Sequence, residues 1–316
     1  MGPLNASSLF RPILEHSASR SIRSKIMERD ARRESSFTLR QAETASVPLL
    51  SPNRLRDKLG LDSGADTLYI LGSGASIEDL TSAHFDHIAK HSSVGINNWG
   101  VHPFVPDIYS FESVPWVGDG QDFPRAMGLL DRGDIRSRRP EILILRPKTS
   151  WEIDKLRVLP DELRTSVSFY GRVTPATRES RNLGGDIEGY FAHTVPRYPS
   201  AVLDSGASVV RMTVVGILLG FRRIVLAGVD LNGSPYFWER NPGYLSDLAS
   251  PPPVNNQVTS THETASSSNR PFDVITMLRA IGVFFQAEKG GQLLVASPDS
   301  ALAEFLPIET WGKTRA

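Results

Sequence analysis

The sequence contains no cysteine among its 316 residues, and its charges cancel: 35 Lys and Arg face 35 Asp and Glu. The lack of cysteine excludes a disulfide framework, a thiolate nucleophile and a thiolate metal site. The balanced charge gives no net field that would draw the chain to nucleic acid. The sequence also lacks an apolar run of about 18 residues, which a transmembrane helix would need. Near Met1 we find no apolar stretch long enough for a secretory signal. We therefore expect a cytoplasmic protein, peripheral at the inner membrane face at most.

Residues 1–60 differ in texture from the rest of the chain. Apolar Ile22, Ile26 and Met27 lie between serines and a series of basic residues, which are Arg20, Arg23, Lys25, Arg29, Arg32, Arg33 and Arg40. One interpretation is a short basic amphipathic helix that contacts anionic lipid or a partner. The other, which we prefer from sequence, is a solvated, partly disordered leader. Residues 61–316 then form the folded domain.

From residue 67 onward, short apolar runs alternate with helical patterns. The runs predict strands at 67–73, 93–97, 107–112, 141–146, 166–170, 223–229 and 292–296. Helical periodicity covers 205–219, 273–288 and 299–305. Strands that alternate with helices predict an α/β, Rossmann-like and mainly parallel sheet with helices on both faces. Because 209–219 is apolar nearly all round, we expect that helix to pack centrally on the sheet.

Two polar segments interrupt this alternation. Residues 240–271 contain Pro251-Pro252-Pro253 and Ser266-Ser267-Ser268, and 173–199 is rich in Gly, Arg and Pro. Structureless segments longer than about 15 residues are usually lids, binding loops or disordered. The first of them, about 240–271, is the predicted lid-like loop.

The first predicted strand runs into Gly72-Ser73-Gly74-Ala75-Ser76. Glycine lets a backbone approach a ligand, and a helix N-terminus favours a phosphate. Ser76 and Asp79 form a capping signal for a helix that reaches about residue 90. The turn lacks the G-x-G-x-x-G spacing of dinucleotide sites, and no P-loop motif occurs. A tight turn that binds no ligand is the alternative interpretation.

Polar residues close three other predicted strands: Asn97 and Asn98, Glu112, and Asp230. Ligands of open α/β sheets bind outside the carboxyl ends of the strands, so we expect these side chains to converge. Asparagine reads a nucleobase or a sugar hydroxyl with donor and acceptor together. A carboxylate there can act as base, nucleophile or hydroxyl acceptor. For Asp230, a turn-forming role in Asp230-Leu231-Asn232-Gly233 is the alternative.

The histidines offer two further hypotheses. His262 lies in the lid-like loop, where it is either a general base or simply solvated. His84, His87 and His91 fall on one predicted helix, a weak pattern for metal binding. No D-x-D carboxylate pair occurs in the chain, which weakens a mechanism that depends on a magnesium diphosphate.

Four segments, in order, resemble the bacterial sialyltransferases of the Campylobacter lipooligosaccharide type (glycosyltransferase family 42). They are 68–80 (LYILGSGASIEDL), 95–99 (GINNW), 205–237 (SGASVVRMTVVGILLGFRRIVLAGVDLNGSPYF) and 273–307. The third segment carries a Ser-Gly helix start, a Leu-Gly-Phe break, a G-V-D strand end and an N-G-S-x-Y turn. The resemblance implies a Rossmann-like variant of the GT-A fold, a CMP-sugar donor, a glycan acceptor and neither metal nor cofactor.

The resemblance also implies roles for individual residues. The CMP cradle would be formed by Gly72, Ser73, Gly74, Ser76 and Asn97, with Ser205, Gly206 and the loop of Ser297, Pro298 and Ser300 lining the same site. Tyr236 would hydrogen-bond the leaving phosphate, and His262 would deprotonate the acceptor hydroxyl. Hydroxyl and amide donors can stabilise a single phosphate without Mg²⁺. The resemblance thus implies an inverting transfer of a sialic-acid-like sugar in the synthesis of a cell-surface glycan.

The sequence departs from the family at three places, which keeps other functions open. One is the position of His262, which lies farther from Asp273 than the family spacing suggests. Leu231 stands where the family has a second tyrosine, and Val202-Leu203-Asp204 stand where it has a basic residue. A retaining CMP-Kdo transferase, with Asp230 or Glu112 as the nucleophile, is the second enzyme hypothesis. A pterin diphosphokinase-like enzyme would require Mg²⁺ and ATP. A catalytically inactive nucleotide-binding module is the non-enzyme alternative.

Overall fold

The computed structural model describes residues 7–61, 66–112, 130, 132–145, 147, 150–156, 159, 161–246, 252 and 272–311. Within them, eight strands form one sheet in the order β6-β5-β4-β3-β2-β1-β7-β8, and every neighbouring pair is parallel. The strands are β1 (Thr67–Leu71), β2 (Ser92–Ile96), β3 (Ile108–Glu112), β4 (Glu141–Leu145), β5 (Val167–Val173), β6 (Ala201–Leu203), β7 (Arg223–Ala227) and β8 (Gln292–Val295). This confirms the predicted Rossmann-like α/β sheet.

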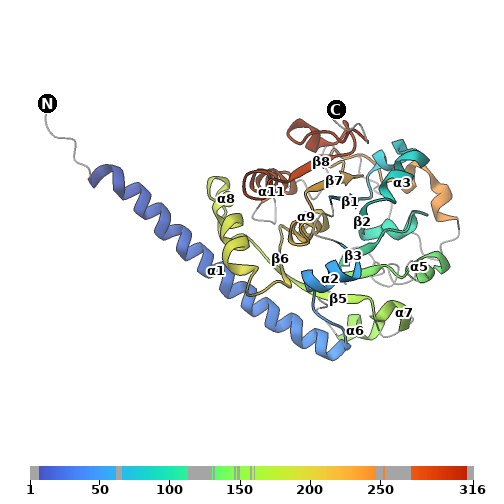
Figure 1. The fold of residues 1–316 in the computed structure, drawn as a ribbon, viewed down its shortest axis with the longest axis horizontal. Coiled ribbons are helices and arrows are strands. Elements are labelled where there is room, and N and C mark those ends of the chain that lie inside the picture. Colours follow the sequence, from blue (N-terminus) through green and yellow to red (C-terminus); the bar gives the residue numbers. More distant parts are fainter. Residues whose placement is uncertain are drawn as a thin grey trace.

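Helices cover both faces of the sheet (Figure 1). Successive side chains of β1 point to opposite sides: Leu68 and Ile70 belong to one hydrophobic cluster, Tyr69 and Leu71 to the other. The first cluster includes residues of α2 (Pro52–Lys58), α8 (Ser180–Gly189), α9 (Ser208–Leu218) and α11 (Val274–Lys289). The second includes residues of α3 (Ser82–Ile88), α5 (Gly133–Arg138), α6 (Ser150–Leu156), α7 (Asp161–Arg164) and α10 (Phe237–Arg240). None of the described helices has the length and hydrophobicity needed to cross a bilayer.

Helix α9 packs at the centre, as its all-round apolar sequence predicts. Every residue from Ser208 to Ile217 is buried, including Arg211, whose exposed fraction is 0%. A charged side chain in such a position must be paired, because an isolated buried charge is strongly unfavourable.

The N-terminal segment differs from the partly disordered leader that its composition suggests. Residues 7–45 form one helix, α1 (Ser7–Ala45), which runs along the outside of the domain (Figure 1). Met27, Ala31, Thr38 and Ala42 are buried on its inner side, and its contacts are with β5, α8 and the turn that follows α8. An apolar stripe with helical spacing is thus buried here, and tertiary packing, more than intrinsic propensity, stabilises such a helix.

The structure also differs from the sequence prediction at three places. The turn after β1 forms only a short 3₁₀ helix, η1 (Ala75–Asp79), and the chain restarts at α3 behind Thr81. Residues 173–199 are largely helical, because α8 continues into the single π-helical turn η3 (Tyr190–Thr194). The three-residue strand β6 was not predicted, since so short a run has no measurable periodicity. The remaining short helices are η2 (Asn97–Val101), η4 (Pro242–Leu245) and η6 (Ala301–Glu304).

Candidate functional site

A cavity of about 180 Å³ opens at the carboxyl ends of β1, β2, β3 and β7. Strand β1 lies between β2 and β7, where the strand order reverses direction, which is the place where open α/β sheets bind ligands. Seven predicted site residues line the cavity together: Ser73, Gly74, Asn97, Glu112, Gly206, Asp230 and Tyr236. Asn98, also predicted, does not belong to its described lining.

The glycines after β1 are held against the end of β7. The Gly72 N–H donates to the carbonyl oxygen of Ala227 and the Gly74 N–H to that of Gly228, both at 2.7 Å. A Cβ added at Gly74 would lie 2.4 Å from Asp230 Oδ2, and one at Gly72 would lie 2.4 Å from the Gly228 oxygen. The close approach that requires glycine here is therefore between two strands of the chain itself, and neither amide is free to cradle a phosphate.

Ser76 and Asp230 form the next link between β1 and β7. Asp230 Oδ2 accepts from the Ser76 N–H at 3.0 Å, and Oδ1 accepts from the Ser76 hydroxyl. Both residues are buried. Ser76, predicted to cradle CMP, is not among the described residues that line the cavity; its polar groups fix the position of the Asp230 carboxylate.

The helix N-terminus that meets the cavity is that of α9. Gly206, Ala207, Ser208 and Val209 all line it, and Ala207 is the N-cap residue. The first four N–H groups of a helix have no acceptor within the helix, and the macrodipole gives them partial positive charge. Asp204 Oδ1 accepts from the N–H groups of Gly206 at 2.6 Å and Ala207 at 3.1 Å, which fixes the approach to the helix.

Beneath this N-terminus lies a buried charged network. Arg211 pairs with Asp204 at 2.9 Å (Nη1 to Oδ1) and with Glu112, and its Nε donates to the Tyr170 hydroxyl at 3.2 Å. The exposed fractions of the side chains are 0% for Arg211 and Asp204 and 25% for Glu112. Burial raises the pKa of Tyr170, so its hydroxyl stays protonated. Of these charged residues, only Glu112 belongs to the described lining of the cavity.

Asn97 and Ser208 complete the polar floor. Asn97 has φ of 56°, in the left-handed region that asparagine tolerates better than most residues. Its Oδ1 accepts from the Ser208 hydroxyl at 2.8 Å, and Glu112 Oε1 lies 3.3 Å from the same hydroxyl. Because the amide oxygen is used in this way, the Asn97 NH₂ group remains to donate to a ligand. We assign the amide orientation from these hydrogen bonds.

Ser73 and Tyr236 form the wall opposite α9. Gly74 and Tyr236 make an isolated antiparallel bridge, and the Phe237 N–H donates to the Ser73 carbonyl at 3.0 Å. The Tyr236 ring stacks on Trp238 with 4.5 Å between centroids and an interplanar angle of 20°. Within the described residues, the Ser73 hydroxyl has no hydrogen-bond partner, so it is available to a ligand.

The other predicted residues lie behind the lining. The Ser300 hydroxyl donates to the Val229 carbonyl at 2.7 Å, and Ser297 Oγ accepts from the Asp299 N–H, so the loop with Pro298 supports the β7 turn. Ser205 is 2% exposed, with a hydroxyl that has no partner in the described part of the chain. His262 and most of 240–271 lie outside the described residues.

The three histidines near α3 belong to an aromatic cluster. His87 and His91 lie 4.9 Å apart between ring centroids, and His84 lies 4.4 Å from Trp311. Burial lowers the pKa of His91, and the nearby His87 adds to this shift. Within the described residues, no group of three or more His, Cys, Asp or Glu side chains is arranged to hold a metal ion.

Sequence reasoning missed four functional positions: Asp204, Ser208, Arg211 and Gly228. Arg211 was detectable in principle, since a lone arginine within an apolar helix needs a buried acid. Its partners Asp204 and Glu112 are 7 and 99 residues away in the chain, so the sequence does not indicate that they lie close to it.

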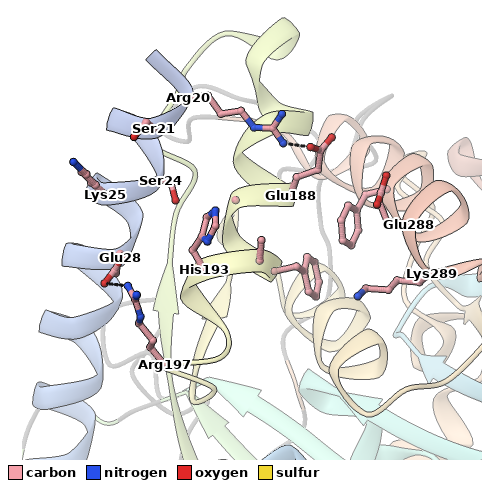
Figure 2. Close-up of a pocket in the computed structure, with 14 residues that line it drawn as sticks. Arg20, Ser21, Ser24, Lys25, Glu28, Glu188, His193, Arg197, Glu288 and Lys289 are labelled. Atoms are coloured by element: carbon pink, nitrogen blue, oxygen red, sulfur yellow. Dashed lines mark hydrogen bonds and ion pairs between the residues drawn. The ribbon is translucent and has the colours of Figure 1, made fainter. Parts of the chain in front are cut away.

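A second cavity, of about 680 Å³, lies between α1, η3 and α11. Figure 2 shows its wall, where Arg20 pairs with Glu188 and Arg197 pairs with Glu28. Phe191 stacks on Phe284 beside it, with 4.6 Å between centroids. None of the sequence-predicted site residues lines this cavity.

Comparisons with known proteins give one distant likeness. No family model matches the chain, and no curated protein matches it significantly in sequence. The sialyltransferase CstII from Campylobacter jejuni in complex with cytidine-5'-monophosphate is similar, with a TM-score of 0.41 at 14% identity over 79% of this chain and 88% of that chain. The CstII complex with the substrate analogue CMP-3FNeuAc gives 0.42 at 14% identity over 79% and 89%. At such TM-scores the likeness is distant.

Proposed function

We propose that this chain is a CMP-sugar-dependent glycosyltransferase that moves an acidic, sialic-acid-like sugar to a glycan acceptor. The observation that carries the proposal is the N-terminus of α9, which opens into a cavity whose described lining includes Glu112 and Asp230 but no Lys, Arg or His. The order and spacing of the motifs shared with bacterial sialyltransferases support the same function.

The charges of the cavity favour a nucleotide with a single phosphate. A helix N-terminus stabilises one phosphate through its free N–H groups and dipole. A diphosphate or triphosphate brings further negative charge next to the Glu112 and Asp230 carboxylates, and Arg211, which lies behind Glu112, is already paired with Glu112 and Asp204. At the phosphate itself, the single charge of a CMP-sugar fits this balance better than the phosphate chain of ATP or of a nucleoside diphosphate sugar.

Uncharged hydrogen-bond donors in the cavity can stabilise the leaving phosphate. Ser73 offers a hydroxyl and Asn97 an amide NH₂, and Tyr236 lines the same cavity. When the glycosidic bond to the phosphate oxygen breaks, that oxygen gains negative charge, and preoriented donors stabilise it in the transition state. We assign Tyr236 and the α9 N-terminus to this role.

For the chemical step, we propose inversion without a metal. The acceptor hydroxyl oxygen attacks the anomeric carbon, the bond from that carbon to the phosphate oxygen breaks, and CMP leaves with the bonding electrons. The proton of the acceptor hydroxyl passes to His262, a residue of the proposed lid at about 240–271. In this mechanism Asp230 positions the β1 turn through Ser76 and does not react.

A retaining transfer is the second candidate, and one observation favours a particular nucleophile for it. Glu112 reaches the cavity with a quarter of its side chain exposed, and its ion pair with Arg211 orients the carboxylate. The two oxygens of Asp230 both accept hydrogen bonds from Ser76. A glycosyl-enzyme would therefore form on Glu112.

A ligand screen by thermal unfolding tests the nucleotide assignment. We expect CMP to raise the melting temperature more than ADP, ATP or NAD, since a ligand at about 100 times its Kd adds about 2.7 kcal/mol. The full chain should keep this shift, and its turnover with a CMP-sugar, in EDTA. A largest shift with ATP or NAD, or turnover that requires Mg²⁺, would contradict the proposal.

A further inference from the structure

The charges of α1 are sorted by face. Of its acids between residues 19 and 45, Glu28, Asp30 and Glu34 are half-buried. Glu28 pairs with Arg197 of the domain, and Glu34 Oε1 accepts from the Arg172 N–H at 3.1 Å. On the same inner side, Arg23 pairs with Asp186 at 2.7 Å. Glu28 and Glu34 thus help to hold α1 to the domain, whereas the Asp30 carboxylate lies 3.7 Å from Arg29 Nε on the helix itself.

The outer face of α1 is basic and partly apolar. It consists of the exposed residues Ile22, Lys25, Ile26, Arg29, Arg32, Arg33, Leu39 and Arg40. Lys25 and Arg33 lie at its borders, where each also lines a cavity together with residues of the domain. Two acids accompany this basic face: Glu43, near the end of the helix, is exposed, and the Asp30 side chain is 48% exposed and pairs with Arg29. Lys25 and Ser24 both belong to the lining of the second cavity, so this part of α1 marks the border between its inner and outer faces (Figure 2).

Three aliphatic side chains are exposed to solvent between these cations. Ile22 is 59% exposed, Leu39 45% and Ile26 36%. Ile22 and Ile26 are one helical turn apart, with Lys25 and Arg29 beside them, and the Arg29 side chain is 78% exposed. Arginine or lysine on a polar face beside aliphatic residues is the pattern of helices that lie in a membrane interface.

We propose that the outer face of α1 binds the surface of an anionic lipid bilayer, with the helix axis parallel to the membrane. The inner face is already buried against β5 and α8, so the domain would be carried on the side of α1 away from the lipid. Residues 19–45 alone present about 40 Å of helix. The basic residues attract acidic headgroups, and the isoleucines enter the boundary between headgroups and acyl chains.

Co-sedimentation of the full chain with vesicles tests this surface. We expect binding to phosphatidylcholine vesicles that contain roughly 30% phosphatidylserine, little binding to pure phosphatidylcholine, and release at about 0.5 M NaCl. Each basic residue near such a surface is worth about fivefold in partitioning. Arg29→Glu with Arg33→Glu should therefore lower partitioning by about 25-fold or more. Ile22→Ser with Ile26→Ser should also weaken it.

Two matched controls lie off this face. Arg181→Glu changes an arginine of α8 whose side chain is 82% exposed, and Val283→Ser changes an aliphatic residue of α11 that is 65% exposed. Both should bind vesicles as the unmodified chain does. All variants should keep the wild-type melting temperature, because the altered side chains are exposed.

Three results would overturn the proposal. They are equal binding to neutral and acidic vesicles, binding that survives the double charge reversal, and equal loss in the control variants. Sedimentation equilibrium without vesicles adds a fourth: a dimer that the isoleucine substitutions dissociate would assign the face to a second copy of the chain.

Discussion

The carboxylate of Asp230 accepts two hydrogen bonds from Ser76, one from the backbone N–H at 3.0 Å and one from the hydroxyl. These bonds join the end of β7 to the turn after β1, on the floor of the cavity. Asp230→Ala should lower the free energy of unfolding by about 1–3 kcal/mol, because it leaves two buried donors of Ser76 unsatisfied. Urea denaturation measures this loss. Asp299→Ala, at an exposed side chain nearby, is the control and should have almost no effect.

Gly74→Ala should destabilise the fold as well as the ligand site. The new methyl group would lie 2.4 Å from Asp230 Oδ2 and 2.8 Å from the Gly228 oxygen, so the β1–β7 contact must open. We expect a drop in melting temperature even without ligand. Gly184→Ala is the matched control, since its methyl group would meet nothing within 4 Å and alanine favours a helix. An unchanged melting temperature for Gly74→Ala with lost CMP binding would instead support a pure phosphate-space role.

Arg211→Met should be among the most destabilising single substitutions in the chain. It removes the cation that pairs with Asp204 and Glu112, and the Asp204 side chain is fully buried. Breaking a buried pair in this way costs about 3–5 kcal/mol. Arg211→Met with Asp204→Asn should recover part of the loss, as seen in chemical denaturation. A double variant no more stable than the single one would contradict the pairing as the cause.

Stability should fall between neutral and acidic pH because of His102. Burial, assisted by the charge of Arg132, lowers the pKa of His102 from 6.5 to about 4. Between these values the unfolded chain binds a proton that the folded chain does not, so the free energy of unfolding decreases as pH falls through this window. The full effect is about 3 kcal/mol. Urea titrations at several pH values should give a flatter profile for His102→Gln than for the unmodified chain.

Two variants distinguish the inverting mechanism from the retaining one. With inversion, His262→Ala should lower turnover by about 10²–10⁴ while the CMP-induced thermal shift is retained. With retention, intact-protein mass spectrometry after mixing with the CMP-sugar alone should show a glycosyl adduct that Glu112→Gln abolishes. An adduct on Glu112 together with an active His262→Ala variant would contradict inversion but leave the nucleotide assignment intact.

Sequence periodicity alone determined the class of fold and the location of the crevice. The apolar runs that become β1, β2, β3 and β7 are buried strands with polar residues just beyond them, and parallel strands bring their carboxyl ends to one edge. Asn97, Glu112 and Asp230 meet at one cavity as expected from their places at strand ends, together with Ser73 and Gly74 of the glycine turn. Tyr236, which also lines it, was indicated only by the sialyltransferase resemblance, and Asn98 is not among the described lining residues. Local patterning suffices here because each strand end is defined by its own few residues.

Only the tertiary structure decided what each of these groups is free to do. The glycine amides after β1 and the Ser76 donors are used within the chain, and the helix whose N-terminus lines the cavity is α9, which follows β6 in the sequence. The burial of α1 against the domain and the Glu112–Arg211–Asp204 network likewise join residues far apart in sequence. Hydrogen bonds and ion pairs of this kind depend on distances between separate elements, and a linear pattern carries no information about those distances.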